Sequence, residues 1–191
     1  MNRLLFSEGF PAPPTHRWLV QMKGKDSKDF LHRLTTANTH ALQPGTCVPA
    51  CFLNPAGKIE SFFLLGCETP DHYWLDLECT EGKPERAHLL ALLDRYIFAE
   101  KIEILGTENG WAHAWELDVS PSGAFVSSAD CLRFTHGTRQ SVWTTASRLK
   151  EWGARAPLTG EMEAYRVEQL IPARGHEIDG EGSPLEVGLA D

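Results

Sequence analysis

The chain has 191 residues, the length of one domain or of two small units that share a core. Its 42% hydrophobic and 23% charged content is typical of a folded globular protein and excludes wholesale disorder. With 18 Lys and Arg against 26 Asp and Glu, the net charge of −8 argues against direct binding to nucleic acid.

Membrane and secretory signals are weak in this sequence. The uncharged stretch at residues 46–57 is interrupted by two prolines and is too short to span a bilayer. The first ten residues carry Glu8 and lack the long apolar region of a signal peptide. Five cysteines, an odd number in a chain of this length, favour reduced thiols over a disulfide framework. We therefore expect a cytoplasmic protein without membrane contact.

The first third of the chain predicts a strand followed by a helix. Residues 1–15 hold three prolines and are expected to form an irregular lead-in. Polar and apolar residues alternate over 17–23, which predicts a strand. Asp26 is expected to cap a helix that runs to about Leu34. The residues that this helix should bury are Phe30, Leu31 and Leu34.

A hairpin, a third strand and a long helix are expected next. Residues 46–53 and 58–67 predict two strands, because the turn-forming segment 54–57 separates them. Residues 72–79 predict a third strand, and an apolar stripe predicts a helix over about 84–99 that packs on a sheet. This stripe comprises Leu89, Leu92, Leu93, Tyr96 and Ile97, and the face of the third strand comprises Tyr73, Leu75 and Leu77. A further strand is expected at 101–105.

The second half of the chain gives weaker signals. Strands are expected at 111–119, 131–136 and 142–145, and helices at about 146–152 and 160–170. The segment 175–191, rich in glycine and acidic residues, is expected to be an extended loop. This mixture of strands and helices predicts an α+β fold with a largely antiparallel sheet.

Several common motifs are absent or incomplete. Gly57 and Lys58 do not form a phosphate loop, because Phe52 and Ile59 stand where that loop needs Gly and Ser or Thr. Cys47 and Cys51 should share one face of a strand, and we expect small buried hydrophobes there, since a metal site needs more converging ligands. The eight histidines show no zinc-binding spacing, and the chain has no G-x-S-x-G elbow.

Arg166 and Glu168 form the most informative charged pair. Composition alone favours a solvated, charged helix face at these positions. In the alternative, Glu168 points into a cavity and its carboxylate accepts two hydrogen bonds from the N–H/NH₂ edge of a heterocycle such as a pterin. The spacing of the two residues does not choose between these interpretations.

Four segments taken together resemble one known family. The segment Leu53–Ile59 (LNPAGKI) is similar to the family's LLNPKGRI, and Tyr165–Glu168 (YRVE) is similar to its LRLE. The other two segments are 29–38 with 42–45, and 96–104, and the segment that begins at Tyr165 also includes 175–179 and 184–186. The chain thus resembles the folate-binding superfamily of the glycine-cleavage T-protein (aminomethyltransferase) and the YgfZ-type proteins. The resemblance covers about residues 16–191, and 106–158 match poorly.

The resemblance implies a single folate-binding domain of aminomethyltransferase type over residues 1–191. Its subdomains would be about 16–105 and 106–191, built from duplicated β-α-β units with mainly antiparallel sheets. The family's C-terminal barrel would be absent, which makes the chain a shortened member. The implied cofactor is tetrahydrofolate or one of its one-carbon derivatives.

The resemblance also implies binding residues. Glu168 matches the glutamate that grips the pterin, and Arg166 would line the site beside it. The turn that contains Asn54 and Lys58 would lie near the mouth of the cavity. No catalytic residue and no metal ligand is assigned.

One departure from the family affects the expected function. T-proteins carry an Asp-Asp pair shortly after the hairpin turn, one of them catalytically required, and this chain has Ser61 and Phe62 there. Ser61 resembles the YgfZ branch, whose KGCYxGQE signature would follow Asp191. The resemblance therefore implies a YgfZ-type folate-binding protein that supports iron–sulfur enzymes, with iron–sulfur client proteins as partners.

Two alternatives stay open. The first is an aminomethyltransferase-like transferase that carries out one-carbon transfer. The second is a degenerate scaffold that kept the fold and lost the ligand. A missing barrel would expose an apolar face, which a homodimer would cover.

Overall fold

The computed structural model describes residues 4–7, 17–78, 85–106, 110–119, 123–158, 160–173 and 176–189. The elements in chain order are β1 (Leu4–Phe6), β2 (Arg17–Lys23), α1 (Ser27–Leu34), β3 (Thr46–Leu53), β4 (Ile59–Thr69), β5 (His72–Glu78), α2 (Glu85–Tyr96), β6 (Glu103–Gly106), β7 (Ala112–Leu117), β8 (Phe125–Ser128), β9 (Cys131–His136), β10 (Arg139–Thr144), α3 (Ala146–Glu151) and α4 (Glu161–Glu168).

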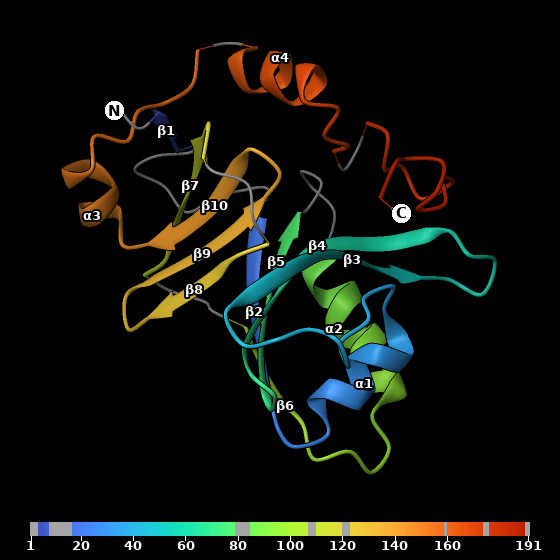
Figure 1. Cartoon of the computed structure of the whole chain (residues 1–191). Coiled ribbons are helices and arrows are strands. Elements are labelled where there is room, and N and C mark those ends of the chain that lie inside the picture. The colour runs from blue at the N-terminus through green and yellow to red at the C-terminus, as the bar shows by residue number, and fades with distance from the viewer. Residues whose placement is uncertain are drawn as a thin grey trace.

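The strands form two five-stranded sheets (Figure 1). One sheet has the order β1-β7-β10-β9-β8, and the other has the order β3-β4-β5-β2-β6. Every neighbouring pair within them is antiparallel. The predicted α+β fold with mainly antiparallel sheets is therefore confirmed. The described residues show no closed barrel.

Helices α1 and α2 pack on the outer face of the β3-β4-β5-β2-β6 sheet. Tyr73, Leu75 and Leu77 lie on this face, as their alternation predicts. The helices contribute Phe30 and Leu31 from α1 and Leu89, Leu92 and Leu93 from α2, all buried. Tyr96, expected in the same stripe of α2, is 38% exposed.

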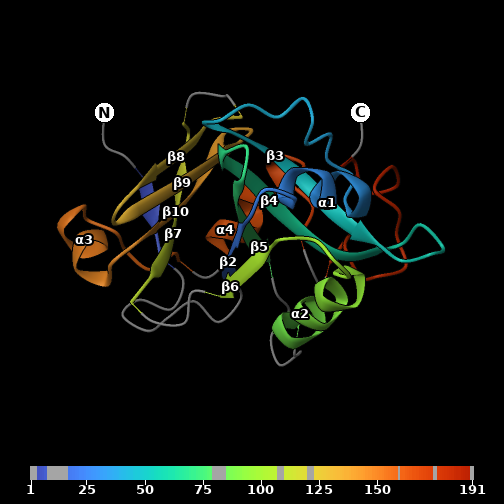
Figure 2. The same ribbon diagram turned by 90° about the horizontal axis from the view of Figure 1, so that it is seen from below.

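The inner faces of the two sheets pack against each other. Leu19, Leu64 and Trp74 of one sheet meet Phe125, Phe134 and Trp143 of the other. Gly66 allows this close approach, because a Cβ atom there would lie 2.5 Å from the Phe125 ring. On the far side, Leu149 of α3 packs on Leu5, Ala114 and Val142. The order of layers is helices, sheet, sheet, helix (Figure 2).

Several local expectations were wrong. Residues 4–6 of the expected irregular lead-in form β1, which pairs with β7. Asp26 makes no side-chain capping bond to α1, and its carboxylate accepts a hydrogen bond from the Lys101 backbone N–H at 2.7 Å. Strand β8 was not expected. The expectations for Cys79, Pro84 and Gly175 fall outside the described residues.

The expected hairpin is confirmed, and β4 contains a bulge near its start. Leu53 pairs with Ile59, whereas Phe52 pairs with Ser61, so Glu60 is the extra residue.

Within the described part of the chain, no helix is both long and apolar enough to cross a membrane.

Candidate functional site

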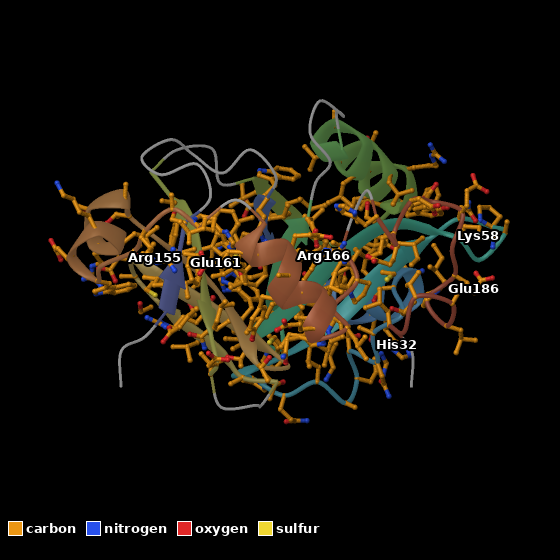
Figure 3. The ribbon with its side chains drawn as sticks, turned by 90° about the horizontal axis from the view of Figure 1, so that it is seen from above. His32, Lys58, Arg155, Glu161, Arg166 and Glu186 are labelled. Atoms are coloured by element: carbon orange, nitrogen blue, oxygen red, sulfur yellow. The ribbon has the colours of Figure 1, made fainter. Side chains whose placement is uncertain are left out.

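Helix α4 is tied to the edge of the first sheet. At its start, Arg155 Nη2 lies 2.7 Å from Glu161 Oε1. Further along, the Tyr165 hydroxyl lies 2.8 Å from Thr138 Oγ1 in the β9–β10 turn. Met162 and Tyr165 pack against Phe6, Trp115 and Leu117. Figure 3 shows α4 crossing the molecule, with residues 176–189 leading from it toward the β3–β4 hairpin.

Arg166 anchors the segment 176–189 to α4. Its Nη1 donates to Glu177 Oε2 at 2.9 Å and to the Ile171 carbonyl at 3.3 Å, and its Nε donates to Glu163 Oε2 at 2.6 Å. The Arg166 side chain is 11% exposed. Its hydrogen bonds lower the pKa of the Glu163 carboxyl. The guanidinium thus uses its donors to hold two carboxylates and one backbone carbonyl in place, so Arg166 has a positioning role.

The turn of the β3–β4 hairpin holds the far end of the same segment. The Asn54 side-chain oxygen accepts hydrogen bonds from the backbone N–H groups of Ala56 at 2.9 Å and Lys58 at 3.0 Å. Lys58 Nζ lies 3.5 Å from Glu186 Oε2. Figure 3 shows Lys58 and Glu186 together, away from Arg166. Arg166 and Lys58 therefore hold opposite ends of the segment 176–189.

An apolar seam joins this segment to the hairpin between its two ends. Ile178 is 1% exposed and packs with Cys51, Ile59 and Phe62. The backbone N–H of Ile59 donates to the Gly182 carbonyl at 3.1 Å. This seam defines the side of the hairpin that faces residues 176–189.

Ser61 and Phe62 are the residues expected to correspond to the Asp-Asp pair of the resembled family. Phe62 is 3% exposed and lies in the apolar seam. Ser61 pairs with Phe52, whose face packs on α1 and α2, and it is 8% exposed. Neither position offers a charged group to a ligand.

Glu168 is the last residue of α4, and its side chain is exposed. No hydrogen bond or ion pair links its carboxylate to another described residue. The pterin-binding role expected for Glu168 stays a prediction, as do the roles expected for Arg166, Asn54 and Lys58.

A group of buried charged and aromatic residues between the sheets was not predicted from the sequence. This inter-sheet cluster comprises Arg17, Asp76, His113, Trp115 and Arg139. Arg17 Nε donates to Asp76 Oδ1 at 3.0 Å, and Nη2 lies 2.8 Å from Oδ2 without the alignment of a hydrogen bond. The Arg17 and Arg139 guanidinium carbons lie 4.6 and 4.2 Å from the Trp115 ring centroid.

Arg139 is the residue of this cluster whose buried side chain has a donor without a hydrogen-bond partner among the described residues. Burial lowers the pKa of its guanidinium to about 10, although the nearby carboxylates of Glu78 and Asp76 act in the opposite direction. Tyr165 of α4 packs against Trp115, the ring on which the Arg139 guanidinium lies, so Arg139 is close to α4. Its Nε is buried and has no hydrogen-bond partner among the described residues. Such a donor is suited to an acceptor from a ligand or an ordered water molecule.

One sequence signal pointed to this cluster. Asp76 interrupts the otherwise apolar stretch Tyr73–Leu77, and a charged residue inside a buried strand needs a partner. The partner, Arg17, is supplied by the neighbouring strand β2.

Acid is expected to destabilise the fold through His113. Burial, followed by the charges of Arg17 and Arg139, holds the His113 pKa well below its usual value of 6.5. The unfolded chain therefore binds a proton that the folded chain does not as the pH falls below about 6.5. We expect a loss of about 1.4 kcal/mol in unfolding free energy per pH unit below that value while folded His113 stays neutral.

Urea unfolding at several pH values checks this expectation. The H113Q variant should show a shallower loss on acidification than the unmodified chain. Part of the slope should remain, because burial also lowers the pKa of His72 and His136. An identical slope in H113Q and the unmodified chain would contradict the assignment.

The anchoring role of Arg166 leads to a local prediction. In R166M, the amide hydrogens of residues 176–189 should exchange at least about tenfold faster, because this end of the segment loses its ion pair with Glu177. The unfolding free energy should fall by only about 1 kcal/mol, since the carboxylates are half exposed. K58M is the control, with a smaller expected effect because its ion pair is longer. Equal exchange in R166M and the unmodified chain would contradict the role.

The described cysteines are buried and form no disulfide, and they are Cys47, Cys51, Cys67 and Cys131. Burial raises the pKa of the Cys47 thiol to about 12. Among the described residues, no group of three or more His, Cys, Asp or Glu side chains is placed to hold a metal ion.

Comparisons with known proteins place the fold. No protein-family model matches the chain. An aminomethyltransferase of Bacteroides thetaiotaomicron is 23% identical over 206 aligned positions, which cover 92% of this chain and 57% of that protein. An aminomethyltransferase of Alkaliphilus oremlandii is 21% identical, with 92% and 56% covered. The chain therefore spans little more than half the length of these curated relatives.

A solved structure agrees with these relatives. The glycine cleavage system aminomethyltransferase T from Bartonella henselae superposes with a TM-score of 0.76 and 12% identity, over 96% of this chain and 55% of that chain. The resemblance to the aminomethyltransferase superfamily is confirmed, and so is the expected aminomethyltransferase-like fold.

Proposed function

We propose that this chain of aminomethyltransferase fold binds a reduced folate, tetrahydrofolate or a one-carbon derivative, without transferring an aminomethyl group itself. The observation that carries the proposal is the shared fold combined with uncharged, buried residues at 61 and 62. The finer proposal is a YgfZ-type role, in which the folate-bound chain supports iron–sulfur client proteins. The buried thiols of Cys47, Cys67 and Cys131, which form no disulfide, support a reducing, cytoplasmic location.

The residues present fit such a ligand in two respects. A pterin presents an N–H/NH₂ edge that a carboxylate can bind, and the exposed Glu168 carboxylate has no described partner. A folate also carries carbonyl and carboxylate acceptors, and the buried Nε of Arg139, close to α4, is a donor without a partner. The bound folate would supply a one-carbon carrier.

The same residues argue against aminomethyl transfer. Transfer needs a group that stabilises the charge that develops on the aminomethyl nitrogen. Phe62 fills the seam with an apolar ring, and Ser61 lies on the face of β4 that packs on the helices. The chain's own residues thus bind and orient a folate in this proposal, and they move no proton.

A calorimetric titration with 5-formyltetrahydrofolate tests the binding. The unmodified chain should bind saturably, and E168A should bind at least about tenfold more weakly, because a charged acceptor is lost. E151A, which removes an exposed carboxylate from α3, is the matched control and should bind like the unmodified chain. Equal affinity in E168A, or no binding by the folded chain, would overturn the proposal. The second outcome would favour a degenerate scaffold.

The names of the two relatives favour one alternative, an aminomethyltransferase activity. It would release ammonia from an aminomethylated carrier protein when tetrahydrofolate is present. We expect no turnover in this assay, and sustained ammonia release by the unmodified chain would favour the alternative.

A further inference from the structure

A pocket of about 310 Å³ is present on the outer face of the β1-β7-β10-β9-β8 sheet. It is lined by Leu5 of β1, Glu116 of β7, Arg133 of β9 and Trp152 at the end of α3. Leu5 belongs to the apolar face that α3 covers, which is the face turned away from the inter-sheet cluster. The pocket is therefore separate from the proposed folate site, and its volume suits a small molecule.

Cross-strand hydrogen bonds fix the polar wall of this pocket. Arg133 Nη1 donates to Glu116 Oε2 at 2.7 Å and to Gln140 Oε1 at 2.6 Å. Gln140 Nε2 in turn donates to Thr135 Oγ1 at 2.6 Å. The Arg133 and Glu116 side chains are 19% and 6% exposed. The guanidinium is thus held in one position before any ligand arrives, which reduces the entropy cost of binding.

One edge of the Arg133 guanidinium remains available to a ligand. Both N–H groups of Nη1 are used by oxygen acceptors, and the remaining partner, the Cys131 thiol, is a weak acceptor that a carboxylate can replace. The edge formed by Nε and Nη2 presents two parallel N–H donors, the geometry that a carboxylate accepts. The guanidinium carbon lies 5.2 Å from the Trp152 ring centroid, so that edge lies beside an aromatic surface.

The charges of the pocket determine which ligands that carry a carboxylate would fit. Arg133 and Glu116 form a pair with no net charge, and the carboxylate of Glu116 repels a second anionic group. A ligand that carries one carboxylate and one ammonium group has the complementary pattern. The apolar part of such a ligand would pack on Leu5 and on Trp152, and Trp152 is 38% exposed.

We propose that this pocket binds a free α-amino acid with an apolar side chain. The carboxylate binds the Nε/Nη2 edge of Arg133, the ammonium lies on the Glu116 side, and the side chain packs on Trp152. This site is independent of the folate proposal, so 5-formyltetrahydrofolate should not compete for it.

Binding of L-phenylalanine to the unmodified chain, followed by NMR titration, tests the proposal. We expect saturable binding, with phenylacetate and phenethylamine each at least about tenfold weaker, because each lacks one charged group. W152A and R133K should each weaken binding about tenfold or more. Trp152 is 38% exposed and lies outside the cross-strand hydrogen-bond network, so W152A tests the site even where R133K unfolds. R148K, on the exposed face of α3, is the control and should bind normally.

Three outcomes would overturn the proposal. They are no saturable binding at millimolar L-phenylalanine, binding that W152A leaves unchanged, and phenylacetate binding as tightly as L-phenylalanine. Displacement of L-phenylalanine by 5-formyltetrahydrofolate would overturn the independence of the two sites.

Discussion

Replacement of Asp76 by alanine is expected to lower the unfolding free energy by about 3–5 kcal/mol. Asp76 is fully buried and holds Arg17, whose side chain is 7% exposed, through contacts of 2.8 and 3.0 Å. Removal of the carboxylate takes away the closest carboxylate contacts of a buried guanidinium among the described residues, and its described contact with Glu78 is 3.9 Å long. Urea unfolding of the purified D76A chain measures the loss.

The control for this prediction is an exposed ion pair. Asp130 and Arg148 are paired with side chains 43% and 42% exposed, and D130A should cost less than about 1 kcal/mol. The double variant R17M/D76L, which removes both charges, should be more stable than D76A, because no buried guanidinium is left without the Asp76 carboxylate. Similar losses in D76A and D130A would show that the pair contributes little to stability.

The second large effect is expected at Gly24, the residue that follows β2. A Cβ atom there would lie 1.9 Å from the Lys101 carbonyl oxygen, and the backbone has φ +134°. Both the steric overlap and the backbone strain must be relieved in G24A, so we expect a loss of about 3–5 kcal/mol. Urea unfolding again gives the value.

Gly57 is the comparison position for Gly24. Its φ is +76°, and a Cβ atom there would meet nothing within 4 Å, so G57A carries only the conformational cost of about 1 kcal/mol. The difference between G24A and G57A measures the overlap with Lys101 together with the greater backbone strain at φ +134°. Equal losses in the two variants would contradict a steric effect at Gly24.

The β3–β4 hairpin and α2 were predicted correctly, because the residues that determine them lie within their own segments. The β3–β4 hairpin follows from alternation on both sides of a turn, and Asn54 closes that turn within four residues. The apolar spacing of Leu89, Leu92 and Leu93 likewise placed α2 on a sheet. In each case the physical cause lies within the predicted segment.

Long-range contacts decided the expectations that were wrong. Strand β1 exists because Leu4 pairs with Leu117, a partner that no local pattern reveals. Asp26 is a residue type that often caps helices, but its carboxylate instead accepts a hydrogen bond from the Lys101 backbone N–H. The inter-sheet cluster depends in the same way on how two sheets pack, so Arg139 gave no signal in its own segment. The binding roles expected of Glu168, Asn54 and Lys58 stay predictions.

The buried thiols lie in different layers of the fold, so their reaction with an alkylating agent can be used to follow local unfolding. An alkylating agent reacts with thiolates, and burial raises the pKa of the Cys47, Cys67 and Cys131 thiols. Cys47 lies between the two sheets, Cys67 lies beneath the helices, and Cys131 lies beneath α3. The alkylation rate of each thiol therefore measures how fast one particular layer becomes exposed to solvent. The order in which the thiols are modified shows which layer unfolds first.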